Sequence, residues 1–166
     1  MKRIYLPVVA LLFTGSLFLT SCKKGDQGPA GTANVIYSDW LDVTFEDVTE
    51  QGAEFKTWVA EISAPKLDNA ILSTGEIKVF LNVNTAADPT VIEASTIGLT
   101  TVFRLNSINL IGASDLDDDD PYSTFTSQGQ KSYQYRYVLI PGGVKATSSV
   151  NWNNYKEVQH ATGMKN

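Results

Sequence analysis

Residues 76–84 contain the alternating pattern that most constrains what this chain can fold into. The apolar residues of the segment stand at every second position: Ile77, Val79, Leu81 and Val83. They alternate with Glu76, Lys78, Phe80, Asn82 and Asn84. Because successive side chains of a β-strand point to opposite faces of a sheet, the segment is predicted to be a half-buried strand.

Other segments with a period of two predict further strands. They span residues 35–45 (one or two strands), 55–62, 91–94 and 132–140. The pair Gln51-Gly52 precedes the second of them, and Pro141-Gly142-Gly143 ends the last, where glycine and proline are typical turn residues. The spacing of strands and turns favours an all-β domain over an alternating α/β fold.

Residues 99–111 form a longer segment that changes face. Phe103 and Leu105 share one parity, whereas Ile108 and Leu110 share the other. Because a shift of one residue moves every following side chain to the opposite face, we expect a bulge or a break near Asn106-Ser107.

Two short segments have helical signals. Residues 65–72 place Leu67 and Ile71 four positions apart, with Pro65 in the first turn and Gly75 beyond the end. Residues 154–161 begin with an asparagine cap, have Glu157 three positions later, and are followed by Gly163. The predicted fold class is mainly all-β: an antiparallel β-sandwich or partly open barrel with one or two short helices, after an N-terminal signal segment.

The N-terminal segment has the features of an export signal. Met1-Lys2-Arg3 precede an apolar run, residues 4–19, which Pro7 and the polar step 14–16 interrupt. A spanning helix needs about 20 continuous apolar residues, so this run fits a signal peptide better. Ordinary secretory cleavage requires a small residue three positions before the cut, and Leu19 stands there for a cut after Ser21.

The segment Leu19-Thr20-Ser21-Cys22 resembles the lipobox of bacterial lipoproteins at all four positions. The resemblance implies that residues 1–21 are removed, that the Cys22 thiol carries a diacylglyceryl group, and that the freed amine is acylated, for example with palmitate. The alternative is an ordinary buried cysteine. Two or three acyl chains anchor a protein stably, whereas one chain binds only reversibly.

Residues 22–33 are predicted to form a tether between the lipid and a single β-rich domain, residues 34–166. Glycine recurs at positions 25, 28 and 31, which is a collagen-like pattern. It lasts only two triplets, which is too short for a triple helix, so a flexible tether is the favoured interpretation. Cys22 is the only cysteine, so the domain contains no disulfide and no thiol nucleophile.

Net charge excludes one class of partner. The chain has 13 basic and 18 acidic residues. Removing residues 1–21 takes away Lys2 and Arg3 and no acid, which leaves 11 basic residues against 18 acidic ones. Such an acidic chain is a poor nucleic-acid binder, because that affinity depends on neutralising phosphates. It is also a poor electrostatic binder of anionic membranes, so we expect attachment to depend on the lipid.

The acidic segment 115–121 is a candidate calcium loop. Asp115, Asp117 and Asp119 stand at alternate positions, as the ligands of calcium loops do. The match is partial, because Asp120 stands where such a loop needs glycine and Thr126 where it needs a bidentate glutamate. The alternative is an exposed acidic loop whose charges are screened by solvent. No other metal and no organic cofactor is predicted.

A row of tyrosines is a candidate ligand-binding surface. Tyr133, Tyr135 and Tyr137 are predicted to share one strand face, where they could form a platform for sugar rings. The alternative is packing against neighbouring strands. His160 is the only histidine and cannot form a catalytic triad or a zinc site by itself.

Several segments together resemble a family of uncharacterised envelope lipoproteins of Gram-negative bacteria, which often have longer collagen-like stubs. They are residues 28–31, 34–40, 71–80, 135–143 and 155–158. The resemblance implies an exported β-rich lipoprotein, anchored to the outer membrane. It implies no catalytic residue, so no catalytic site is assigned.

The sequence therefore favours a lipid-anchored envelope protein whose β domain has a non-catalytic binding or structural role. The alternatives are a small glycan-acting hydrolase and a subunit of a surface assembly. A hydrolase would need two carboxylates that converge in a cleft. An assembly subunit would need an open edge strand or a contiguous apolar patch. The lipid bilayer is the expected partner, through acylated Cys22, together with an unidentified protein or glycan.

Overall fold

The computed structural model describes residues 35–142 and 150–164, so the signal segment, Cys22 and the tether lie outside the described residues. One antiparallel sheet has the strand order β1 (Ile36–Tyr37), β10 (Gln134–Ile140), β4 (Glu76–Asn82), β5 (Val91–Glu93). A second has the order β2 (Glu46–Asp47), β3 (Lys56–Ser63), β7 (Ser107–Ser114), β6 (Thr100–Arg104). The remaining elements are the hairpin β8 (Phe125–Ser127) and β9 (Gln130–Ser132), η1 (Ala94–Ile97), α1 (Asn69–Thr74) and α2 (Tyr155–Thr162).

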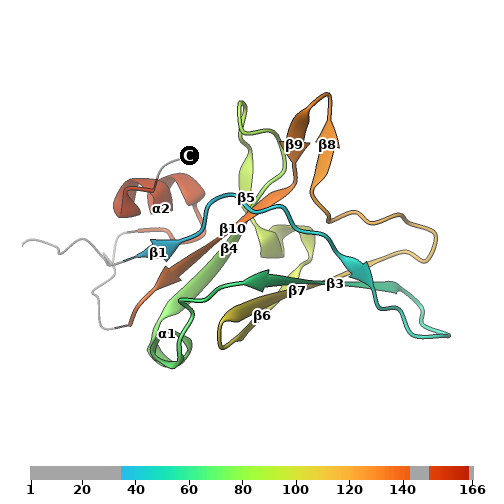
Figure 1. Cartoon of the computed structure of the whole chain (residues 1–166), viewed down its shortest axis with the longest axis horizontal. Helices are drawn as coiled ribbons and strands as arrows, with labels where there is room; N and C mark the ends of the chain where they lie inside the picture. Colours follow the sequence, from blue (N-terminus) through green and yellow to red (C-terminus); the bar gives the residue numbers. More distant parts are fainter. Residues whose placement is uncertain (1–34, 143–149, 165–166) are drawn as a thin grey trace, which may run out of the picture.

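The predicted mainly-β class is confirmed. The two four-stranded sheets enclose the main hydrophobic core, and in the described part of the chain they do not close into a barrel (Figure 1). Side chains from both sheets fill this core, among them Trp58, Ile62, Leu81, Leu110 and Tyr135.

Strand β4 is buried on both faces rather than on one. Val79 and Leu81 enter the main core, as their parity predicts, and Phe80 on the opposite face is also fully buried. The reason is a third layer that strand periodicity cannot reveal: α2 covers this face, and Tyr155 and Val158 pack in one cluster with Phe80. The order of layers is therefore sheet, sheet, helix.

The predicted C-terminal helix is confirmed within one residue at each end. The Asn154 side chain accepts hydrogen bonds from the backbone N–H groups of Lys156 and Glu157, which an N-cap must satisfy. Gly163 ends the helix in the left-handed conformation, with φ 70°, which costs glycine little.

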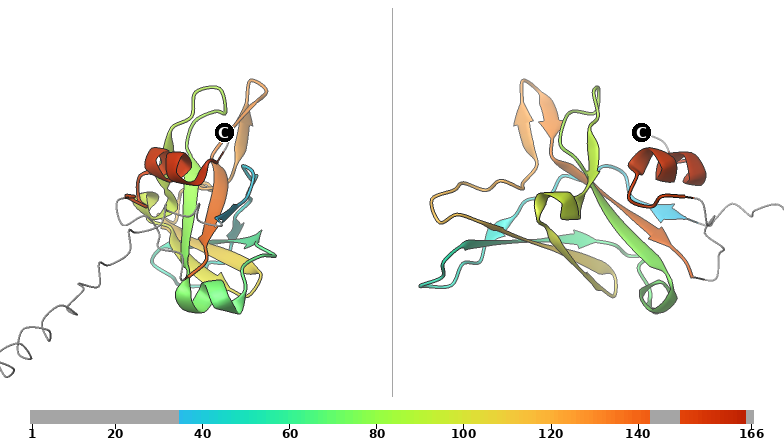
Figure 2. Two further views of the ribbon diagram at one scale, coloured as in Figure 1. Left: turned by 90° about the vertical axis from the view of Figure 1, so that its left-hand side faces the viewer. Right: turned by 180° about the vertical axis from the view of Figure 1, so that it is seen from behind.

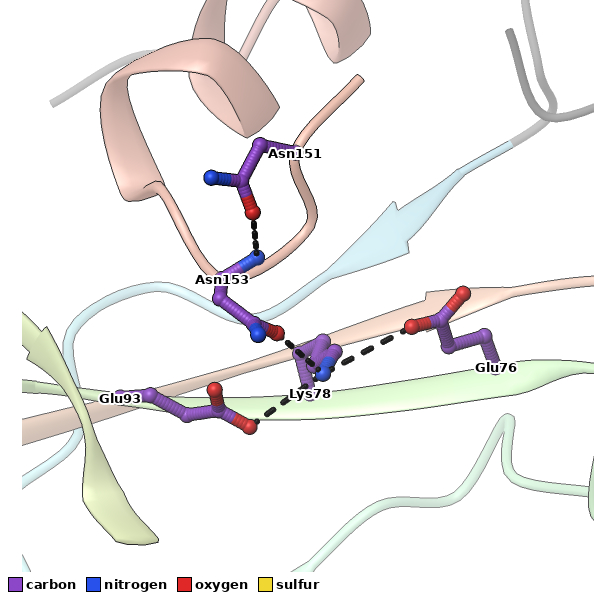
Figure 3. A network of polar contacts seen from close by, with 5 residues as sticks. All are labelled: Glu76, Lys78, Glu93, Asn151 and Asn153. Atoms are coloured by element: carbon purple, nitrogen blue, oxygen red, sulfur yellow. Dashed lines mark hydrogen bonds and ion pairs between the residues drawn. The ribbon is translucent and has the colours of Figure 1, made fainter. Parts of the chain in front are cut away.

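A polar network joins the segment before α2 to the sheet beneath it (Figure 3). Lys78 Nζ lies 3.3 Å from a carboxylate oxygen of Glu93 and 3.6 Å from one of Glu76, and it donates a 2.8 Å hydrogen bond to Asn153 Oδ1. The backbone N–H of Asn153 in turn donates to Asn151 Oδ1. The side chain of Lys78 is only 16% exposed, so these partners compensate for much of its lost hydration.

The change of face in residues 99–111 is a strand break. Leu105 and Asn106 form the two-residue turn between β6 and β7, and Asn106 takes φ 62°, which asparagine tolerates better than most residues. The first helix differs from its predicted range: α1 begins at Asn69, because the Asp68 side chain caps it by accepting from the backbone N–H of Ile71. Leu67 and Ile71 are both buried, as expected.

The molecule has two distinct ends along its long axis (Figures 1 and 2). At one end lie the start of β1, α1 and the β6–β7 turn; we call it the α1 end. At the other lie the β2–β3 connection and the loop after β7, which holds the acidic segment 115–121; we call it the acidic-loop end. In the described part of the chain, no helix is long and apolar enough to cross a membrane.

Candidate functional site

Backbone contacts fold the acidic segment into a compact turn after β7. The N–H of Asp118 donates to Asp115 O, and the N–H of Asp115 donates to Asp118 Oδ2. Lys56 Nζ from β3 donates a 2.6 Å hydrogen bond to Asp118 O, which brings one positive charge beside the cluster. Asp120 Oδ1 accepts from the backbone N–H groups of Tyr122 and Ser123, so this carboxylate holds the end of the loop.

The three carboxylates of the calcium hypothesis lie on this loop. Asp115, Asp117 and Asp119 are all exposed. Within residues 35–142 and 150–164, no group of three or more Asp, Glu, His or Cys side chains is arranged to hold a metal ion. The described loop therefore contains no preformed set of ligands, and calcium binding stays a prediction.

The predicted row of three tyrosines is wrong as an exposed platform. Tyr133 does not continue the strand, because it takes φ 59° between β9 and β10. Tyr135 and Tyr137 do share a face of β10, but that face points into the main core, and their exposed fractions are 0% and 7%. Burial raises the pKa of both phenols, and the Tyr135 hydroxyl donates to Tyr122 O at 2.7 Å.

Tertiary contacts hold Tyr133 at the break. Thr124 Oγ1 donates to Tyr133 O at 2.6 Å and accepts from the backbone N–H of Val43 at 3.0 Å. The Tyr133 ring lies against Phe125, with 5.5 Å between the ring centres. Phe125 is 50% exposed, so the two rings form a small aromatic surface at the base of the β8–β9 hairpin.

Tyr133 and the acidic loop meet in a shallow cleft of about 450 Å³. We call it the acidic cleft; it is lined by Ile97, Ala113, Ser114, Asp115, Asp118, Pro121, Tyr122 and Tyr133. It therefore joins one residue of the calcium hypothesis to one of the sugar-platform hypothesis. Carboxylates beside an aromatic ring suit a ligand that has hydroxyl or cationic donors and a flat apolar face.

Sequence reasoning missed two residues of the cleft that have defined roles. The Tyr122 hydroxyl donates to Ala113 O at 2.6 Å, and burial raises the pKa of this phenol. Ser114 Oγ accepts from Trp58 Nε1 at 2.9 Å. Both contacts fix the wall of the cleft to β3 and β7. No sequence pattern predicts these two contacts, because the hydrogen-bond partners of Tyr122 and Ser114 are brought together by the tertiary fold and not by their spacing in the sequence.

A buried cation lies on the β1–β10–β4–β5 sheet, on the face that points away from the main core and toward α2. Arg136 on β10 is 3% exposed, and its Nη1 donates to the Tyr155 hydroxyl at 2.7 Å. The guanidinium lies 4.5 Å from the centre of the Trp40 ring and 5.8 Å from that of Tyr37, within the range of cation–π attraction. Burial raises the pKa of Tyr155, and the nearby Arg136 opposes this shift. An arginine within the apolar run 135–140 was the available sequence signal.

The remaining candidates lie elsewhere. His160 is exposed in the last turn of α2, away from the acidic cleft. A second cleft, of about 340 Å³, separates the β4–β5 connection from the β8–β9 hairpin and is lined in part by Gln130, Lys131 and Gln134. No protein-family model matches the chain, and no curated protein is similar to it at a significant level.

Proposed function

We propose that the chain is an exported lipoprotein, anchored in the outer membrane through lipid on Cys22, whose β domain has a non-catalytic binding or structural role. The observation that carries the proposal is the segment Leu19-Thr20-Ser21-Cys22 directly after a short apolar run. Cys22 is also the only cysteine, so its thiol has no disulfide partner in the chain.

The arrangement of the domain is consistent with display from a membrane. The described chain begins at Val35, beside β1 at the α1 end, whereas the loop after β7, which supplies the carboxylates of the acidic cleft, lies at the other end (Figures 1 and 2). A lipid attached before Val35 would leave the cleft free to meet a partner. We propose that this partner is a hydroxyl-rich or cationic ligand, such as a glycan or a basic peptide segment.

Membrane fractionation of Cys22→Ala tests the anchor. We expect the wild-type chain to fractionate with the outer membrane and its mature mass to include the acyl groups. The variant should appear in the soluble fraction or keep its signal segment uncleaved. A cleaved Cys22→Ala protein that still fractionates with membranes would refute lipidation as the anchor.

A glycan-acting hydrolase is the second candidate, because Asp115 and Asp118 both line the acidic cleft. Glycoside hydrolysis needs two carboxylates with separate roles. The Asp118 carboxylate already accepts from the backbone of Asp115, which favours a structural role for it. Hydrolysis of an envelope glycan by the wild type, lost in both Asp115→Asn and Asp118→Asn, would establish the enzyme over the binding domain.

A further inference from the structure

Exposed apolar and basic side chains gather at the α1 end. Leu105 in the β6–β7 turn is 52% exposed, and Leu72 on α1 is 36% exposed. Two backbone hydrogen bonds join the β6–β7 turn to residues 64–67, the segment that precedes α1: the N–H of Asn106 donates to Leu67 O at 2.9 Å, and the N–H of Ala64 donates to Asn106 O at 2.8 Å. We call this surface the α1 tip and define it by five exposed residues, Pro65, Lys66, Leu72, Arg104 and Leu105; polar residues around them, among them Asp68, Asn69, Ser73 and Asn106, are exposed as well.

The tip carries two exposed basic side chains, in a chain that is acidic overall. Lys66 and Arg104 are exposed, and neither forms an ion pair with another described residue. Of the acids near the tip, Asp68 caps α1 and Glu76 pairs with Lys78, whereas Glu61 on β3 is exposed and forms no ion pair with another described residue. The aspartates of the acidic loop lie at the other end of the molecule (Figure 1).

Strand register places the start of the described chain at the same end as this tip. Ile36 pairs with Leu139, and Leu139 pairs with Ile77, two residues after Gly75, which ends α1. With strands spaced about 4.8 Å apart, Ile36 lies about 10 Å from Ile77. From Cys22 to Val35 the chain advances 13 positions, which even fully extended span only about 45 Å.

We propose that the α1 tip docks on the bilayer that holds the Cys22 lipid. Leu105 and Leu72 enter the interfacial region, and Lys66 and Arg104 contact the phosphates of anionic lipid headgroups. This inference rests on the proposed lipid anchor. Two leucines and two basic residues bind too weakly to attach a free protein. A short tether raises the effective concentration of the tip at the surface to the order of millimolar, at which weak contacts suffice to orient the domain.

Depth-dependent quenching in vesicles tests the docking. The acylated full chain has no free thiol, so Leu105→Cys provides one site for an apolar fluorophore, which takes the place of the leucine side chain, and Val48→Cys provides a matched site at the acidic-loop end. In vesicles that contain phosphatidylglycerol and brominated lipid, we expect at least twofold quenching of the label at position 105 and none at position 48. Equal quenching at the two positions would overturn the proposal.

Charge reversal tests the basic residues. In the chain labelled at position 105, Lys66→Glu together with Arg104→Glu should abolish the quenching. Lys156→Glu is the matched control, because Lys156 is an exposed lysine on α2 and borders a separate pocket with Pro89 and Val91. Quenching that survives the double reversal, or that the control also abolishes, would overturn the assigned role of the two residues.

Vesicle flotation separates this inference from the anchor. If the wild type floats and Cys22→Ala does not, but the label at position 105 stays unquenched, the anchor stands and the docking is wrong. If the wild type does not float, the anchor itself is wrong. The same label is also measured in detergent without vesicles. If its accessibility to a soluble quencher falls as the protein concentration rises, a second copy of the chain covers the tip, and the proposal is overturned.

Discussion

The guanidinium of Arg136 lies 4.5 Å from the centre of the Trp40 ring, although the two residues are far apart in the sequence. Arg136 belongs to the centre of β10, and Trp40 to the segment after β1, so the contact ties the entering chain to the core of the sheet. Tyr155 of α2 receives a hydrogen bond from the same guanidinium, and its ring lies 5.8 Å from that of Trp40. One buried cation thus organises the outer layer of the fold.

Tyr155→Phe should destabilise the protein by about 1–3 kcal/mol, because it removes the acceptor of a buried, charged donor. Tyr37→Phe is the matched control: its ring also faces Arg136, but among the described contacts its hydroxyl makes no hydrogen bond. Urea denaturation of both variants measures the difference. Equal losses of unfolding free energy in the two variants would show that the hydrogen bond from Arg136 to the Tyr155 hydroxyl contributes little to stability.

Lys78→Met should lower the free energy of unfolding by about 1–2 kcal/mol, because it leaves the partly buried Glu93 carboxylate without its cation and removes the partner of Glu76. Lys131→Met is the control. Lys131 pairs with Asp42, but both side chains are about half exposed, so solvent screens the pair and its loss should cost less than about 1 kcal/mol. Amide exchange near Asn153 should rise only in the Lys78 variant (Figure 3).

Gly112→Ala should displace a side chain that lines the acidic cleft. A Cβ at this position would lie 2.4 Å from the Tyr122 ring and 2.9 Å from Leu99, so the ring that lines the cleft must move. We expect a loss of about 1–3 kcal/mol from overpacking. Gly52→Ala is the control, because its φ of +87° is strained for alanine but open space surrounds it. Tyr122 ring signals in NMR spectra should shift in the first variant and stay unchanged in the second.

The sequence predicted the elements whose determinants are local. The alternation in residues 76–84 gave β4, and the Asn154, Glu157 and Gly163 signals gave α2. The break at Tyr133 was missed, because a tyrosine with φ 59° has no local signal; Thr124 and Phe125 hold it there through contacts made in the folded state. The cleft was missed for the same reason: it joins the loop after β7 to a break before β10, and only the tertiary fold brings these together.

The calcium hypothesis predicts that millimolar Ca²⁺ raises the melting temperature and that a chelator reverses the rise, because an ion bound only to the folded state stabilises it. The described loop has no ready set of ligands, so Asp115, Asp117 and Asp119 would have to converge around the ion. Asp117→Asn should remove the shift, whereas Asp88→Asn, in the β4–β5 connection, should retain it. A melting temperature that changes with neither calcium nor chelator would refute the hypothesis.

Stability should fall steeply in alkali, because burial raises the pKa of Tyr135 far above its ordinary value of about 10 and also raises the pKa of Tyr122, Tyr137 and Tyr155. Below pH 10 these phenols are neutral in both states, and their contribution is complete. As pH rises past 10, the unfolded chain loses protons that the folded chain retains, so unfolding becomes more favourable, by up to about 1.4 kcal/mol per pH unit for each such tyrosine.

Urea denaturation between pH 8 and pH 11 measures this slope. Tyr135→Phe should start from a lower stability at pH 8, because Tyr122 O loses its donor, but its stability should then fall less steeply. The difference between the two slopes isolates the contribution of Tyr135, whose side chain lies within the core with 0% of its surface exposed. A variant whose stability falls as steeply as the wild type would mean that Tyr135 ionises alike in both states, and that the interior around β10 is open to solvent.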